Sequence, residues 1–176
     1  MLNTGLRIGE LLALTWDKID FENRLVLINA TITTVTNKVP NATTKTKRLI
    51  TNVKTLNGVR YVPLNTQSVD ALEQIKAFYK RHNIKSDFVI CTSSGNMVTH
   101  RSFQTCLDCL LIKAGLPHIG THSLRHSFAC LLLETEKNIK VVSDILGHGS
   151  KSITYNTYIH TKNKDKIDAV NALDSI

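Results

Sequence analysis

The chain has 176 residues, with 22 lysines and arginines against 14 aspartates and glutamates, so its formal charge is +8 at pH 7. A single domain of this length buries roughly 70% of the surface of its unfolded chain and needs no metal or disulfide to fold. The hydrophobic fraction of 42% is typical neither of a disordered chain nor of a membrane protein, and no secretion leader is recognisable. The composition therefore predicts one soluble, cytoplasmic, basic domain over residues 1–176.

The charge and the cysteines narrow the classes of partner and ligand. A positive surplus favours a polyanionic partner, although a solvated basic surface explains the charge equally well. Cys106 and Cys109 form a CxxC pair, but the sequence has no second pair to complete a zinc site. Irregular spacing without a secretion signal predicts free, mostly buried thiols. Neither a metal nor another cofactor is expected. The cysteines are Cys91, Cys106, Cys109 and Cys130.

The pattern of apolar residues and turn signals predicts the elements in chain order. It predicts a helix over 7–16, a strand over 24–33, and a hairpin around Asn57-Gly58 with strands at 48–54 and 59–63. A short extended piece is expected at 87–91. Helices are expected over 66–82, 99–113, 122–134, 138–147 and 151–159, with an amphipathic segment near 165–174. The fold class is therefore α+β, a mostly helical domain with a small antiparallel sheet near its N-terminus.

Two arginines are predicted at the starts of helices, where a cation is electrostatically unfavourable. Arg7 precedes the first apolar stripe, and Arg125 lies in the first turn of a helix that Thr121 can cap. His122 lies about 60° from Arg125 around that helix. The free backbone N–H groups of a first turn already favour an anion. Each arginine alone is an ordinary surface residue, but together they suggest an anionic partner.

The helix predicted over 122–134 has an apolar face that is expected to be buried. The helix after it is expected to end at a glycine. The face of the first comprises Leu124, Phe128, Leu131 and Leu132. Gly147 is well suited to end the helix over 138–147, which places His148 just beyond that end. Tyr158 lies on the helix predicted to follow.

Taken together, these segments resemble the tyrosine recombinases, specifically the integrases of phages and conjugative elements. The order and spacing of the motifs agree from residue 4 to residue 160. The motifs are Thr4-Gly5-Leu6-Arg7-Ile8-Gly9-Glu10-Leu11, Lys54-Thr55 through Arg60-Tyr61-Val62-Pro63-Leu64, His122-Ser123-Leu124-Arg125-His126, Leu146-Gly147-His148 and Thr157-Tyr158-Ile159-His160.

The resemblance implies a catalytic role for six residues. Tyr158 is the nucleophile that attacks a DNA phosphodiester, and a phenol with a pKa near 10 needs a base or a positive field to do so. His122 is the base, and Lys54 is the general acid for the departing 5′-oxygen. The non-bridging phosphate oxygens are bound by the forked guanidinium groups and by a histidine. These last residues are Arg7, Arg125 and His148.

For two of the catalytic roles the sequence offers more than one candidate residue. Tyr155 competes with Tyr158 for the role of nucleophile, and Lys38, Lys45 and Lys47 compete with Lys54 for that of general acid. Glu10 is expected to orient Arg7 across one helical turn rather than to take part in the chemistry. His126 is expected to be structural. His160 can help to position the tyrosine helix and stays outside the catalytic set.

The resemblance also implies the partners and the missing parts. Relatives carry N-terminal DNA-clamping and arm-binding domains, which are expected to be absent from this chain. The predicted function is site-specific recombination at a double-stranded DNA attachment site, by a tetramer on DNA, without a metal or ATP. Residues 165–176 either pack on their own domain or dock on a neighbouring subunit. The alternative function is that of a catalytically silent DNA-binding remnant.

Overall fold

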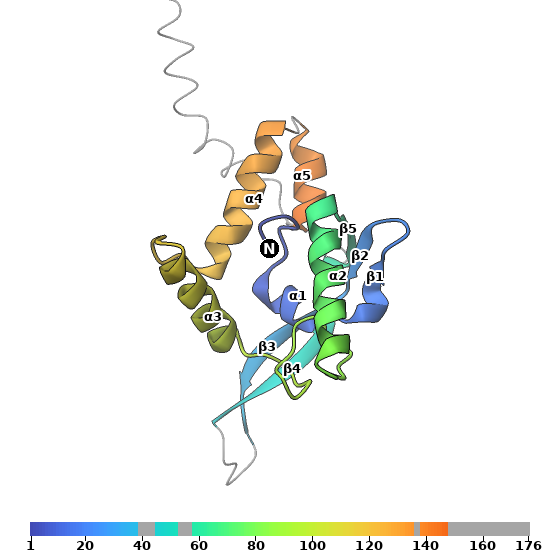
Figure 1. Cartoon of the computed structure of the whole chain (residues 1–176). Coiled ribbons are helices and arrows are strands. Elements are labelled where there is room, and N and C mark those ends of the chain that lie inside the picture. The colour runs from blue at the N-terminus through green and yellow to red at the C-terminus, as the bar shows by residue number, and fades with distance from the viewer. Residues whose placement is uncertain (39–44, 53–57, 136–137, 148–176) are drawn as a thin grey trace, which may run out of the picture.

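The computed structural model describes residues 1–38, 45–52, 58–135 and 138–147. Its elements follow one another as shown in Figure 1. They are α1 (Ile8–Ala13), the 3₁₀-helix η1 (Trp16–Lys18), β1 (Ile19–Asp20), β2 (Leu25–Ile28), β3 (Ala30–Thr36), β4 (Thr46–Asn52), β5 (Arg60–Pro63), α2 (Thr66–Arg81), α3 (His100–Lys113), α4 (Thr121–Thr135) and α5 (Ile139–Leu146). Helices together with small antiparallel sheets confirm the predicted α+β class.

The strands form two separate antiparallel sheets. One sheet has the order β1-β2-β5, and the other pairs β3 with β4. Alternate residues of β2 and β5 face inward, so that Val26 and Val62 are fully buried. The core of this sheet is completed by Leu6, Leu14, Ile28, Leu64 and Val89. The predicted strand over 24–33 is in fact two strands, because the chain leaves one sheet at Asn29 and joins the other.

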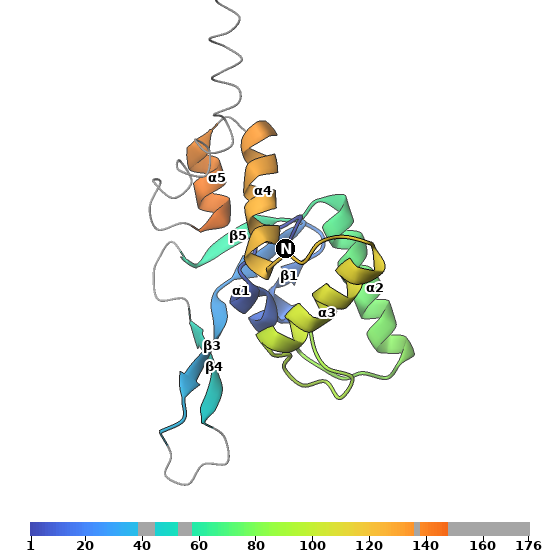
Figure 2. The ribbon, with the colours of Figure 1, turned by 90° about the vertical axis from the view of Figure 1, so that its left-hand side faces the viewer.

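The predicted hairpin around Asn57-Gly58 is wrong in its pairing. Throughout its length β4 pairs with β3, from Thr46 opposite Thr36 to Asn52 opposite Ala30. Strand β5 pairs instead with β2, with Arg60 opposite Ile28. The turn signal therefore separates strands of two different sheets, and the β3–β4 hairpin extends away from the helices in both views (Figures 1 and 2).

Side-chain caps set the starts of several helices. Asn65 accepts a hydrogen bond from the backbone N–H of Ser68 before α2, and Thr99 does the same for Ser102 before α3. Thr121, expected to cap α4, is instead the first residue of that helix, and its hydroxyl lies 3.0 Å from Nε2 of His100. Gly147, with φ at +64°, follows α5 as predicted.

Helices α4 and α5 pack side by side around a second apolar core (Figures 1 and 2). Its buried members are Ala129, Leu133, Val142 and Leu146. The predicted face of α4 is partly wrong, because Leu131 is 58% exposed while Arg125 is buried. Arg125 lies on the buried face of α4, so the spacing of apolar residues alone does not identify that face.

The cysteines agree only in part with the prediction. All four cysteines are free, as predicted, but Cys106 and Cys109 are exposed on α3 rather than buried. Within the part of the chain that the structure describes, no helix is both long enough and apolar enough to cross a membrane.

Candidate active site

Arg7 lies immediately before α1, where Glu10 anchors it from the first turn. The Glu10 carboxylate accepts hydrogen bonds from the backbone N–H of Arg7 at 2.9 Å and from its Nη1 at 2.8 Å. Nη2 of Arg7 donates to the carbonyl of Gly147 at 2.9 Å. The Arg7 side chain remains 43% exposed. Glu10 thus orients Arg7, as the sequence predicted.

A second arginine, missed by the sequence analysis, binds the other side of the same carboxylate. Arg60 of β5 donates from Nη2 to Oε2 of Glu10 at 2.9 Å and from Nη1 to Oε1 at 3.1 Å. Its Nε donates to the carbonyl of Ile145 at 2.8 Å. A signal for it existed, because Arg60 shares the inward alternation of Val62 and Leu64.

Arg125 is the third arginine of this cluster and the most deeply buried, at 4% exposure. Its Nη1 donates to the carbonyl of Gly5, and its Nη2 donates to that of Leu146 at 2.7 Å. Burial, together with the positive charges of Arg7 and Arg60, lowers the pKa of Arg125 to about 10, while Glu10 opposes the shift. Arg125 remains a cation at neutral pH.

Three consecutive carbonyls at the end of α5 therefore each accept a hydrogen bond from a different arginine. Ile145 accepts from Arg60, Leu146 from Arg125 and Gly147 from Arg7. The last carbonyls of a helix lack donors within the helix and carry its partial negative charge, so arginines satisfy them well. The four side chains and three carbonyls are called the arginine junction below; they are Arg7, Glu10, Arg60, Arg125 and the carbonyls of residues 145–147.

Within the part of the chain that the structure describes, the arginine junction carries more positive than negative charge. Three guanidinium groups lie in it, and among the described residues the only carboxylate bound to them is that of Glu10, which Arg7 and Arg60 share. Burial alone would raise the pKa of Glu10, yet the hydrogen bonds and charge of Arg60 and the hydrogen bonds of Arg7 hold it below its ordinary value. A surplus of two positive charges beside a half-exposed guanidinium suits a phosphate group.

The remaining predicted site residues fall into two groups. His122 is exposed and lies one helical turn before Arg125 on α4, so the structure brings it to the same helix end. Lys54, His148 and Tyr158, like the alternative Tyr155, lie outside the described residues, although Gly147 of the arginine junction directly precedes His148. His126 is exposed, with Nε2 lying 3.6 Å from the sulfur of Cys130.

The alternative lysines lie away from the arginine junction. Lys47 belongs to β4 and pairs with Val35. Lys38 and Lys45 flank the two strands of the same hairpin. The described part of this hairpin and α5 lie at opposite ends of the molecule (Figure 1).

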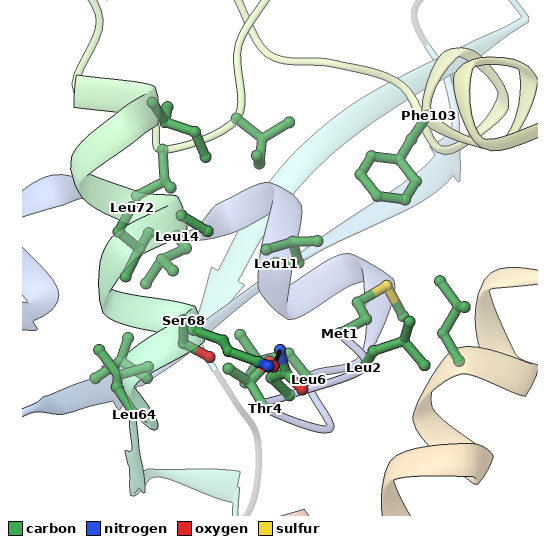
Figure 3. A pocket seen from close by; sticks show the side chains of 18 residues that line it. Met1, Leu2, Thr4, Leu6, Leu11, Leu14, Leu64, Ser68, Leu72 and Phe103 are labelled. Atoms are coloured by element: carbon green, nitrogen blue, oxygen red, sulfur yellow. Dashed lines mark hydrogen bonds between the residues drawn. The ribbon is translucent and has the colours of Figure 1, made fainter. Parts of the chain in front are cut away.

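An apolar pocket of about 350 Å³ is unsuited to a phosphate. It lies between α1, α2 and the N-terminal residues, with Phe103 of α3 at one side (Figure 3). Leucines dominate its lining, and none of the lining side chains carries a charge. It is an incompletely filled part of the sheet core rather than a polar site.

Comparison with known proteins relates nearly the whole chain to one family. The family model described as the phage integrase family matches residues 1–165. A tyrosine recombinase XerC-like protein of Caldanaerobacter subterraneus is 32% identical over 98% of this chain and 47% of its own length. The transposase from transposon Tn916 of Enterococcus faecalis is 31% identical over 91% of this chain and 40% of its own.

Solved structures agree with this relation. The Tn1549 transposon integrase in complex with circular intermediate DNA superposes with a TM-score of 0.75 at 26% identity, over 98% of this chain and 57% of that one. The XerH site-specific recombinase, at 23% identity and a TM-score of 0.67, shares the fold. The chain spans about half the length of the curated relatives that it matches.

Proposed function

Because the chain belongs to the phage integrase family, we propose that its protein carries out site-specific DNA recombination, cleaving and rejoining strands through a 3′-phosphotyrosine intermediate. The observation that carries this proposal is the arginine junction, whose surplus positive charge lies at the end of α5 just before His148. An anionic phosphodiester supplies the missing negative charge.

In the proposed reaction the Tyr158 oxygen attacks the scissile phosphorus, and the bond to the 5′-oxygen breaks. His122 accepts the phenol proton, and Lys54 gives a proton to the departing 5′-oxygen, which leaves as a hydroxyl. The energy of the broken bond is kept in the phosphotyrosine, so the attack of a 5′-hydroxyl rejoins the strand without ATP or a metal.

The arginines stabilise the negative charge that develops on the non-bridging oxygens. Arg7 is half-exposed and can turn its free N–H groups toward a phosphate while Glu10 holds its other side. Arg125 is buried and supplies a fixed charge behind it. His148, which directly follows Gly147, is the remaining residue that binds the phosphate.

The partner is a double-stranded DNA attachment site, and the active assembly is a tetramer on DNA. The relation to an integrase solved with circular intermediate DNA supports the choice of partner. Residues 165–176 are proposed to contact a neighbouring subunit. Deleting them should weaken assembly on DNA, as measured by gel shift, and unchanged assembly would exclude this role.

The test is the formation of a covalent adduct by the full protein that contains this chain. Duplexes from a random-sequence pool, nicked beside the scissile phosphate, release a short fragment after cleavage and thus prevent rejoining. With EDTA present, wild-type protein should give an adduct on a denaturing gel. Tyr158→Phe should abolish it, while the matched control Tyr155→Phe should retain it.

Two other outcomes would change the proposal. Loss of the adduct only in Tyr155→Phe would move the nucleophile to Tyr155. A protein that binds DNA and forms no adduct with any pool member would be the silent DNA-binding remnant.

A further inference from the structure

Among the three arginines of the arginine junction, the Arg60 side chain makes the most hydrogen bonds to described residues. Its Nη1 and Nη2 span both oxygens of the Glu10 carboxylate, and its Nε binds the carbonyl of Ile145. Nη1 also lies 3.4 Å from the carbonyl of Gly58. One side chain therefore connects α1, β5 and the end of α5.

These contacts leave Arg60 unable to act on a substrate itself. Four of its five N–H donors face acceptors of the protein, and its side chain is 7% exposed. The Arg7 side chain, bound to the same carboxylate, is 43% exposed. Any influence of Arg60 on a bound phosphate must pass through the groups that it holds.

We infer that Arg60 is a positioning residue, which keeps Arg7 (through Glu10) and the turn before His148 (through Ile145) in one geometry for the scissile phosphate. This role rests on the proposed function. A bidentate guanidinium–carboxylate pair fixes direction as well as distance, which a single point charge does not.

The glycine at the end of α5 supports this close arrangement. A Cβ added to Gly147 would lie 2.8 Å from Nη1 and 2.9 Å from Cζ of Arg60. The φ of Gly147 is +64°, which also favours glycine. The end of α5 thus packs against the Arg60 guanidinium itself, so that movement of Arg60 displaces the residue before His148.

The main experiment compares Arg60→Met with wild type in the full protein, on the nicked substrate. Single-turnover cleavage should slow by about 10- to 100-fold, because a misplacement of about 1 Å can cost on the order of 100-fold. The dissociation constant for the DNA should change by less than twofold. Arg24→Met is the matched control, because Arg24 is exposed and its guanidinium contacts only Thr66 Oγ1 at 3.4 Å among the described residues; it should cleave like wild type.

Two further variants separate positioning from plain charge balance. Arg60→Lys keeps the buried cation but cannot span the carboxylate and the Ile145 carbonyl together, so it should also be slowed at least fivefold. Full rescue by lysine would overturn the inference. The double variant Glu10→Gln/Arg60→Met should be no slower than the slower single variant, since both act through the same link; multiplying effects would contradict this.

The dependence of the cleavage rate on pH distinguishes a positioning role for Arg60 from a purely structural one, which would leave that dependence unchanged. Glu10 faces Arg7 and Arg60, is within the field of Arg125, and shares a small cavity with Lys18. Without Arg60 the pKa of Glu10 should rise, because the hydrogen bond and charge that oppose the effect of burial are reduced. Cleavage by Arg60→Met should therefore fall further below the wild-type rate as the pH is lowered, and a constant ratio across pH would contradict the link through Glu10.

Hydrogen exchange makes the result independent of activity. In Arg60→Met the backbone amides at the end of α5 should exchange faster than in wild type, whether or not an adduct forms. Faster exchange without any wild-type adduct would refute the proposed function alone. Wild-type cleavage with unchanged exchange and rate in Arg60→Met would refute the positioning role alone, and a parallel loss of DNA binding would show that Arg60 contacts DNA.

Discussion

The sheet core and the arginine junction are stabilised by different interactions. The core around β2 and β5 consists of buried apolar side chains, such as Val26 and Val62, whose attraction has no preferred direction. The arginine junction consists of hydrogen bonds in which each donor meets one particular acceptor. We therefore expect the core to determine how stable the fold is and the junction to determine where the reacting groups lie.

The largest effect is expected at the exposed arm of the junction. In the proposed function Arg7 donates to the scissile phosphate, so Arg7→Ala should slow single-turnover cleavage by about 100- to 1,000-fold. The melting temperature should change little, because the Arg7 side chain is 43% exposed. Cleavage rates and thermal denaturation of the same preparations test this, and a near-wild-type rate would remove Arg7 from the catalytic set.

The reverse pattern is expected in the sheet core. Leu14 is 6% exposed, and Leu14→Ala should lower the free energy of unfolding by about 2–5 kcal/mol. The folded fraction should still cleave within about threefold of wild type, because no donor of the junction is touched. Urea denaturation measures the free energy of unfolding. Cleavage assayed below the temperature of the thermal transition measures the activity of the folded fraction. A loss of cleavage as large as that of Arg7→Ala would show that the two regions are not separable.

The smallest effect concerns acid stability. The pKa of Glu10 is below its ordinary value of 4.5, so the folded state binds this proton less readily than the unfolded state does. The stability that this provides is present above about pH 4.5 and is lost as the pH falls through the folded-state pKa. The difference in unfolding free energy between wild type and Glu10→Gln should therefore narrow below that pH. A difference that stays constant from pH 7 to pH 3 would contradict the pairing.

Local features of the chain were predictable because neighbouring residues decide them. The helices follow from apolar spacing, the end of α5 from Gly147, and the Arg7–Glu10 pair from a separation of three residues on one helix. Arg7 and Arg125, the two arginines predicted at helix starts, both bind carbonyls at the end of α5.

Pairings between distant segments were decided only by the tertiary structure. Asn57-Gly58 favours a tight hairpin locally, yet β5 pairs with β2 because Val62 and Leu64 gain burial in the sheet core beside Val26. Arg60 is 50 residues from Glu10 and 85 from Ile145 in the chain, so no local pattern connects them. The sequence by itself indicated most of the helices and the family to which the chain belongs. The fold decided which arginine is half-exposed and which are buried, because burial and the supply of carbonyl acceptors depend on what packs nearby.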